Sequence, residues 1–246
     1  MVARGELLYT GKAKRVYRTD RDDLYLVEFT DNITAFDGGK KDVLARKGYY
    51  NAQISTRLFQ LLEEHGVPTH FVDMASPTEM VVRACEIVQL EVITRNVAAG
   101  SLVRNYPFEE GQRLQPPVVV FHLKSDAHHD PMLNRDIALA LGICTVREWD
   151  MARRMALEVN RILGEFMGGL GLVMPDLKLE FGRPGGRRNR LVVADELSPD
   201  SMRLWRASDG RVLDKDVYRK GMGDVVESYR EVARLVVPEV FKEGGS

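Results

Sequence analysis

Cysteine is scarce in this chain of 246 residues, and its two cysteines, Cys85 and Cys144, form neither a metal-binding spacing nor a disulfide framework. A reducing compartment, the cytoplasm, is therefore expected. No apolar run reaches membrane-spanning length, and the first residues, MVARGELLY, lack the apolar core of a signal peptide. Positive and negative residues are nearly equal in number, and the net charge is -1. The composition thus predicts neither nucleic acid nor a membrane as a partner.

What remains is a normal globular composition, with 44% hydrophobic and 29% charged residues, long enough for one large domain or two smaller lobes. Apolar periodicity predicts strands over residues 24–29, 79–84, 88–95 and 118–123, and helices over 48–65, 145–170 and 224–236. Thr145 and Glu148 form a capping box at the start of the longest helix. Cys85, Glu86 and Ile87 are expected to form a short connection between two strands.

The stretch from residue 175 to residue 205 predicts a hairpin that gathers ionisable side chains. Its first strand alternates polar with apolar residues, with Asp176, Lys178 and Glu180 on one face and Leu177, Leu179 and Phe181 on the other. A turn at 183–189 leads into an apolar strand at 191–194, which Asp195 and Glu196 follow. Two interpretations are open: a solvated, salt-bridged sheet face, or a carboxylate and lysine site for a divalent metal and a phosphorylated ligand.

Two further segments carry residues suited to anions. In LLYTGKAKRVY (7–17), a glycine followed by Lys12 and Lys14 is typical of phosphate contact or of a basic hairpin turn, and the spacing fails to match a Walker A loop. In EVITRNVAAGSLVRNY (91–106), Arg95 at a strand end precedes Ser101 at the start of a short helix. This arrangement fits an anion clamp or a plain turn of small residues.

The segment KSDAHHDP (124–131) contains adjacent histidines, His128 and His129, whose side chains do not converge on one metal from a helix or strand. An exposed loop is therefore expected rather than a histidine metal site. Lys124 and Asp130 are better candidates for contacts at the edge of a cleft.

Taken together and in order, the motifs YTGKAKRVY, NITAFDG, EVITRNVAAGSLVR, KSDAHHDP, PDLKLEFG, VVADELSPDSMRLW and DKDVYR closely resemble those of the SAICAR synthetase (phosphoribosylaminoimidazole-succinocarboxamide synthase) family. They span Tyr9 to about Arg219. The resemblance implies an α+β, two-lobed fold, with a kinase-like antiparallel-sheet lobe over residues 1–86 and a larger α+β lobe over 87–246. Nucleotide is expected between the lobes.

The resemblance also implies the reaction. Family members use ATP and Mg²⁺ to condense 5-amino-1-(5-phospho-D-ribosyl)imidazole-4-carboxylate, a carboxyaminoimidazole ribonucleotide, with L-aspartate. The products are SAICAR, ADP and phosphate, in de novo purine biosynthesis. Family members are commonly homo-oligomers, often dimers.

Residue roles carry over motif by motif. The resemblance implies a nucleotide site of Lys12, Ala13, Lys14, Val16, Ile87, Glu91 and Asp130. It implies a reacting centre of Asp176, Lys178 and Lys124, with Glu180 and Asp195 as ligands of the metal. It implies substrate contacts from Arg95, Ser101, Asp200, Arg203 and Arg219, of which Arg95, Ser101 and Arg203 clamp the ribonucleotide phosphate. Asp42 is not assigned to the metal, and the basic turn RPGGRRNR is not a family requirement.

The hypothesis for the mechanism is phosphoryl transfer from ATP to the imidazole carboxylate, followed by attack of the aspartate amine on the acyl phosphate. Lysines would screen the anionic substrates. The alternatives are a small-molecule kinase with a related nucleotide lobe, a nucleotide-binding module without turnover, and a purely structural protein.

Overall fold

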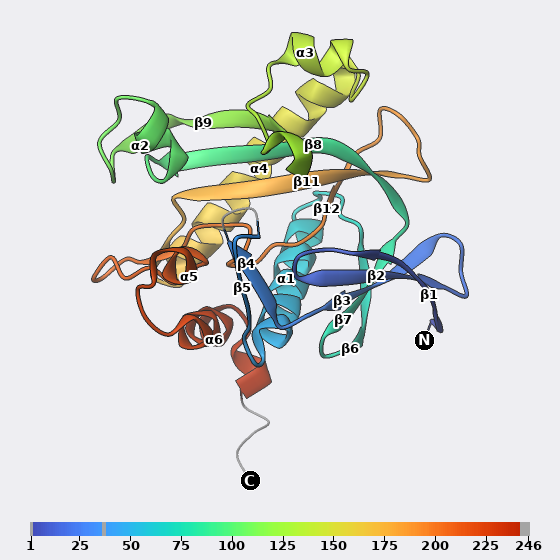
Figure 1. Cartoon of the computed structure of the whole chain (residues 1–246), viewed down its shortest axis with the longest axis horizontal. Helices are drawn as coiled ribbons and strands as arrows, with labels where there is room; N and C mark the ends of the chain where they lie inside the picture. Colours follow the sequence, from blue (N-terminus) through green and yellow to red (C-terminus); the bar gives the residue numbers. More distant parts are fainter. Residues whose placement is uncertain (1, 36–37, 242–246) are drawn as a thin grey trace.

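The computed structural model describes residues 2–35 and 38–241, and Figure 1 shows two antiparallel sheets at different levels with helices packed beside them. The first sheet has the strand order β1-β2-β3-β7-β6. Its strands are β1 (Arg4–Thr10), β2 (Lys14–Thr19), β3 (Leu24–Phe29), β7 (Glu79–Arg83) and β6 (Phe71–Ser76). Helix α1 (Lys47–Glu64) packs against this sheet, and the β4–β5 hairpin (Asn32–Ala35 and Lys40–Val43) lies beside it.

Strand β3 shows why this sheet forms. Val27 and Phe29 point to one side and join the main core, which also contains the buried face of α1. Leu24 and Leu26 point to the other side and pack with Val81 in a small separate cluster. Alternate side chains of a strand face opposite sides, so this strand is apolar on both.

The second sheet has the order β12-β11-β8-β9 and carries the hairpin predicted at residues 175–205. Its strands are β12 (Val192–Ala194), β11 (Asp176–Pro184), β8 (Cys85–Val97) and β9 (Arg113–Leu123). The long helix α4 (Val146–Gly169) packs across one face, where Trp149 stacks on Phe121. Short helical segments α2 (Ser101–Asn105), η1 (Asp126–His128) and α3 (Arg135–Ala140) lie in the connections.

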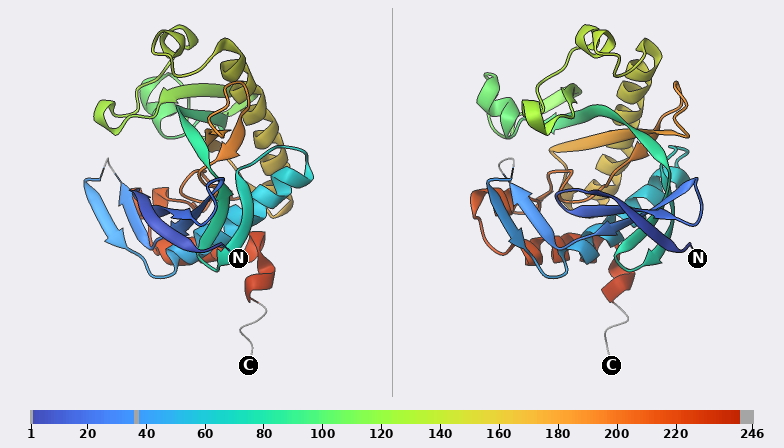
Figure 2. Two further views of the ribbon diagram at one scale, coloured as in Figure 1. Left: turned by 90° about the vertical axis from the view of Figure 1, so that its right-hand side faces the viewer. Right: turned by 45° about the vertical axis from the view of Figure 1, so that its right-hand side comes forward.

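The C-terminal part returns to the first sheet. Strand β10 (Leu172–Val173) pairs with β13 (Trp205–Arg206), and helix α5 (Asp216–Lys220) follows. Helix α6 (Val225–Val236) then packs along α1, and η2 (Pro238–Phe241) ends the described chain, as Figures 1 and 2 show. The two levels are thus joined both by β8 and by this packing of α6 on α1. No helix in the described ranges is long and apolar enough to cross a membrane.

The three predicted helices are confirmed as α1, α4 and α6, and both halves of the capping box at Thr145 and Glu148 are present. Two predictions about β8 were wrong. Cys85, Glu86 and Ile87 are its first residues and not a connection, because they pair with the last part of β11. Arg95 is not at a strand end, since β8 continues to Val97.

The solvated interpretation of the β11 face was also wrong. Leu177, Leu179 and Phe181 are buried as predicted, but Asp176 and Glu180 on the opposite face are buried too. That face lines a cavity, where only Lys178, between Asp176 and Glu180, is partly exposed, and the salt bridges of this interpretation are present.

Candidate active site

Two adjoining cavities lie where the two sheets meet. The hairpin cavity, of about 540 Å³, lies under the β1–β2 hairpin and includes Gly11, Val16 and Ile87 in its lining. The arginine cavity, of about 550 Å³, is lined by residues that include Arg95 and Arg203. The two share a wall formed by Lys12, Glu91, Asp130, Lys178, Asp200, Ser201 and Lys215. Ligands bound in the two cavities would therefore be neighbours on either side of this wall.

The hairpin cavity has apolar sides and a charged end. Val16, Val27, Val82 and Ile87 from β2, β3, β7 and β8 supply the apolar surface. The tight β1–β2 turn closes over it, with the Gly11 amide donating to the Lys14 carbonyl at 2.8 Å. An apolar slot that ends in lysines and carboxylates suits a flat base with a polyphosphate tail.

Lys14 reaches from β2 to the end of β12. Its ammonium forms ion pairs with Asp195 and, at 3.0 Å, with Glu196. Burial alone would lower the pKa of Lys14, but these two carboxylates more than offset it and raise that pKa. Burial likewise works to raise the pKa of Asp195, and Lys14 and Lys178 outweigh it and lower that pKa. Both groups are therefore charged at neutral pH.

Lys178, from the polar face of β11, occupies the shared wall. Its ammonium donates to Glu91 at 2.6 Å and to Glu180 at 3.1 Å. The second oxygen of Glu180 accepts from Lys124. Burial would lower the pKa of Lys178, but Glu180 and Glu91 raise it, so the ammonium stays charged. The result is an alternating array of cations and anions beside the hairpin cavity.

Glu180 and Asp195 fit a magnesium ion that phosphate oxygens would help to bind. β11 and β12 pair so that Glu180 lies opposite Ala194, the last residue of β12. Asp195, the next residue, therefore lies beside Glu180 across the two strands. Within the described ranges, no three acidic, histidine or cysteine side chains converge as a complete cage. Mg²⁺ does not need one, since it is commonly bound by one or two carboxylates together with substrate phosphates and water.

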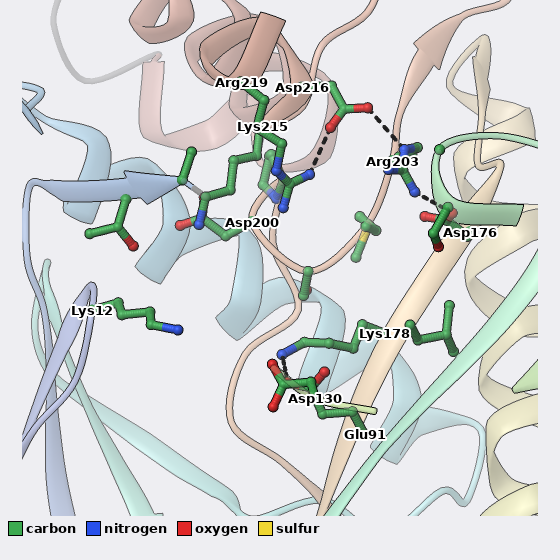
Figure 3. A pocket seen from close by; sticks show the side chains of 18 of the residues that line it. Lys12, Glu91, Asp130, Asp176, Lys178, Asp200, Arg203, Lys215, Asp216 and Arg219 are labelled. Atoms are coloured by element: carbon green, nitrogen blue, oxygen red, sulfur yellow. Dashed lines mark hydrogen bonds and ion pairs between the residues drawn. The ribbon is translucent and has the colours of Figure 1, made fainter. Parts of the chain in front are cut away.

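The arginine cavity is organised by two buried carboxylates. Asp176 accepts from Arg95 at 3.1 Å and also pairs with Arg203. Asp216 accepts from Arg203 at 3.0 Å and from Arg219 at 2.7 Å, as Figure 3 shows. These carboxylates hold the planes of the guanidinium groups in place, and a pre-positioned guanidinium can bind a phosphate through two hydrogen bonds.

The start of α2 completes the clamp. Ser101 accepts a 2.9 Å hydrogen bond from Arg95. Gly100 precedes it with φ 59°, and a Cβ added there would overlap the Arg203 guanidinium. Glycine is thus needed at this position both for its backbone conformation and for the close approach of Arg203.

Every residue predicted for the site lines one of the two cavities. Those predicted for nucleotide, Lys12, Ala13, Lys14, Val16, Ile87, Glu91 and Asp130, line the hairpin cavity, as do Lys124, Glu180 and Asp195. Those predicted for substrate, Arg95, Ser101, Asp200, Arg203 and Arg219, line the arginine cavity together with Asp176. Lys178 borders both. The histidines of KSDAHHDP lie in an exposed loop, as expected.

Asp200 differs from the other predicted substrate residues because its partners come from helices behind the cavity wall. One accepts from Lys47 and from Asn51, the latter at 2.9 Å, and the other accepts from the Tyr229 hydroxyl at 2.8 Å. Lys47 is fully buried. Burial would raise the pKa of Asp200, but Lys47 and Lys215 lower it.

Sequence reasoning missed two residues of the cavity lining, Lys215 and Asp216, and Lys47, which pairs with Asp200 from behind the wall. It named Glu196 only as one of the ionisable groups of the hairpin. Lys215 and Asp216 lie inside the quoted motif DKDVYR, which could have identified them. Glu196 follows the predicted metal ligand Asp195 directly. Lys47 has no local signal, since it meets Asp200 only in the folded chain.

Comparisons with known proteins agree with one another. A sequence model of the family described as SAICAR synthetase matches residues 7–236. Phosphoribosylaminoimidazole-succinocarboxamide synthase of Methanoculleus marisnigri is 53% identical over 97% of this chain and 98% of that protein.

Among solved structures, SAICAR synthetase (Type-2) in complex with ADP is similar, with 42% identity and a TM-score of 0.90 over 95% of this chain and 98% of that one. Phosphoribosylaminoimidazole-succinocarboxamide synthase from Ehrlichia chaffeensis is 36% identical, with a TM-score of 0.91 over 94% and 98% of the two chains.

Proposed function

The chain belongs to the SAICAR synthetase family, and on this premise we propose that its two cavities form one active site for the ATP-dependent joining of carboxyaminoimidazole ribonucleotide to L-aspartate. The observation that carries the proposal is the shared wall. A cavity suited to a nucleotide meets a cavity suited to a phosphorylated substrate at Lys178, Glu91 and Lys215. A ligase that passes a phosphoryl group between two bound molecules needs this adjacency.

ATP is assigned to the hairpin cavity. Its base would lie between Val16 and Ile87, and its phosphates would extend toward Lys14 and Lys178. The solved relative with bound ADP supports nucleotide binding by this fold. The ribonucleotide is assigned to the arginine cavity, with its phosphate on Arg95, Ser101 and Arg203.

The proposed chemistry has two steps. An oxygen of the imidazole carboxylate attacks the γ-phosphorus of ATP, the bond to the β-phosphate oxygen breaks, and ADP and an acyl phosphate form. The aspartate amine then attacks the acyl carbon, loses a proton, and displaces phosphate to leave an amide. Lys124 and Lys178 would offset the negative charge that gathers on the transferring phosphoryl group in a partly enclosed site.

Glu180 and Asp195 are the residues that would hold Mg²⁺. The ion would neutralise charge on the phosphates when bound. We expect Asp195→Asn to lower kcat by about 10²-fold or more while leaving the fold intact, because a neutral amide is a poor ligand for this hard cation. Steady-state kinetics and circular dichroism check this, and near wild-type turnover would remove Asp195 from the metal site.

One assay tests the function. Purified protein with the ribonucleotide, L-aspartate and Mg-ATP should give SAICAR, ADP and phosphate in equal amounts. A small-molecule kinase, the alternative, would release ADP and give a stable phosphorylated product without L-aspartate. Transfer of ¹⁸O from the substrate carboxylate to the released phosphate would support the acyl phosphate, and phosphate free of label would contradict it.

The proposal also covers the division into lobes, the oligomeric state and the cellular compartment. The nucleotide lobe is residues 1–86 and the substrate lobe residues 87–246, the enzyme works as a homodimer, and it resides in the cytoplasm. The family resemblance supports the dimer, and the two unpaired cysteines support the compartment. Light scattering after size-exclusion chromatography tests the dimer, and cell fractionation tests the compartment.

A further inference from the structure

We propose that Lys215 binds a carboxylate of the amino-acid substrate and holds it at the wall between the two cavities. This inference rests on the proposed function and adds to it a subsite for L-aspartate. Lys215 directly precedes α5 and lines both cavities. Figure 3 shows its side chain beside Asp200, with Lys12 and Lys178 at the other borders of the same space.

The first support is that Lys215 is a largely buried cation with unused hydrogen-bond donors. Its side chain is 15% exposed, and its nearest carboxylate oxygen, on Asp200, lies 3.7 Å from the ammonium. This distance is an ion pair and is too long for a hydrogen bond. Within the described part of the chain the ammonium donates no hydrogen bond, although an ammonium group has three N–H donors.

Asp200 has most of its acceptor sites filled by other residues. Its two oxygens already accept from Lys47, Asn51 and Tyr229, which come from α1 and α6. The helices thus hold Asp200 in place, and its contact with Lys215 is an ion pair at 3.7 Å with no hydrogen bond. The Lys215 ammonium faces the cavities and is not among the buried polar atoms that lack a partner in the described chain. An anion that enters can therefore accept a charge-assisted hydrogen bond from it.

The neighbouring arginines, unlike Lys215, donate hydrogen bonds to carboxylates of the chain. Arg203 lies between Asp176 and Asp216, and Arg219 donates to Asp216. Their carboxylates orient them toward the phosphate clamp. Lys215 instead has its backbone amide bonded to the Pro199 carbonyl at 3.1 Å, which holds it beside the loop that carries Asp200. Lys215 is thereby held where the two cavities meet.

The position of Lys215 indicates which of the three substrates it binds, namely L-aspartate. The amine must reach an acyl carbon that is activated where the cavities meet, so L-aspartate has to bind at the shared wall. L-aspartate carries two carboxylates and needs cations there. Burial lowers the pKa of Lys215, and a bound carboxylate would raise that pKa again, so binding of the anion favours the charged lysine.

The test is the Michaelis constant of each substrate in Lys215→Met. We expect the KM for L-aspartate to rise about 10- to 100-fold, as for loss of a charge-assisted hydrogen bond, with the KM values for ATP and the ribonucleotide changed less than about twofold. Lys215→Arg, which keeps a cation, should recover part of the loss. Lys41→Met is the control, because Lys41 is an exposed lysine of β5 that lines neither cavity.

An unchanged KM for L-aspartate in Lys215→Met overturns the proposal. An equal rise in Lys41→Met, or a rise confined to ATP or the ribonucleotide, overturns it as well. Succinate, a dicarboxylate without an amine, should inhibit the wild type, and its inhibition constant should rise in Lys215→Met in parallel with the KM for L-aspartate. If Lys215→Met fails to fold by circular dichroism, Lys215→Gln replaces it with the same expectations. A wild-type protein that forms no amide refutes the proposed function itself, whereas an active wild type with the contrary KM pattern refutes the Lys215 assignment alone.

Discussion

His70 at the edge of the hairpin cavity gives this protein a predictable dependence of stability on pH. The residue is 5% exposed, and its ring packs edge-on against Phe59 with centroids 5.1 Å apart. Its Nε2 has no hydrogen-bond partner in the described chain. Burial lowers the pKa of His70 to about 3, with Lys14 and Arg83 acting in the same direction and Asp195 opposing.

The sign follows from proton binding. Between its unfolded pKa of about 6.5 and its folded pKa, His70 takes up a proton in the unfolded chain but not in the folded one. Its contribution to stability is therefore complete above about pH 6.5 and is lost as the pH falls. Each pH unit below 6.5 costs about 1.4 kcal/mol, which gives a loss of about 2 kcal/mol at about pH 5.

The variant His70→Phe isolates this contribution. Phenylalanine can pack beside Phe59 and has no titratable group. We expect the free energy of unfolding of the wild type to fall by about 2 kcal/mol more than that of the variant between about pH 7.5 and pH 5. Urea denaturation at the two pH values measures the free energy of unfolding of each protein. Comparing its change with pH between the two proteins removes the effect of the substitution itself and of the carboxylates that titrate in both.

His65→Gln is the control, because His65 is exposed at the end of α1. It should show the same pH dependence as the wild type to within about 0.5 kcal/mol. Equal pH dependence in the wild type and in His70→Phe would refute the reasoning, since a buried neutral histidine cannot leave that difference unchanged.

Two more substitutions test contacts described above. Glu148→Gln should destabilise the fold by about 2–3 kcal/mol in urea denaturation, because it removes the buried one of the two carboxylates that pair with Arg183 and leaves only the exposed Glu86. Glu158→Gln on the same helix, which breaks a half-exposed pair, should cost less than about 1 kcal/mol, and a similar cost for both would contradict the burial argument. Gly100→Ala should raise the KM for the ribonucleotide as Arg203→Ala does, because its Cβ displaces the guanidinium; an unchanged KM would separate Arg203 from the phosphate.

The sequence alone was enough to predict the three long helices, the buried face of β11 and the family. Apolar periodicity predicted α1, α4 and α6, and alternation predicted the buried face of β11 with Leu177, Leu179 and Phe181. These features depend on residues a few positions apart, which a local pattern can express. The ordered motifs pointed to SAICAR synthetase, and the comparisons confirmed that family.

Local pattern failed where contacts join distant residues. Cys85, Glu86 and Ile87 looked like a connection, but Arg183 bonds to Glu86 at 2.6 Å and β11 pairs with all of this segment. A strand that forms only because a partner arrives from another part of the chain has no signal of its own.

Only the tertiary structure decided which charged side chains are occupied and which have donors left. Asp200 is predicted as a substrate contact and lines the cavity, but only the fold shows that Lys47 and Tyr229 reach it from helices far away in the sequence. Lys215 was not noticed, yet its ammonium is left at the junction of the cavities with donors unused. Hydrogen bonding depends on distances of about 3 Å between atoms, and for residues so far apart in the chain only folding sets those distances.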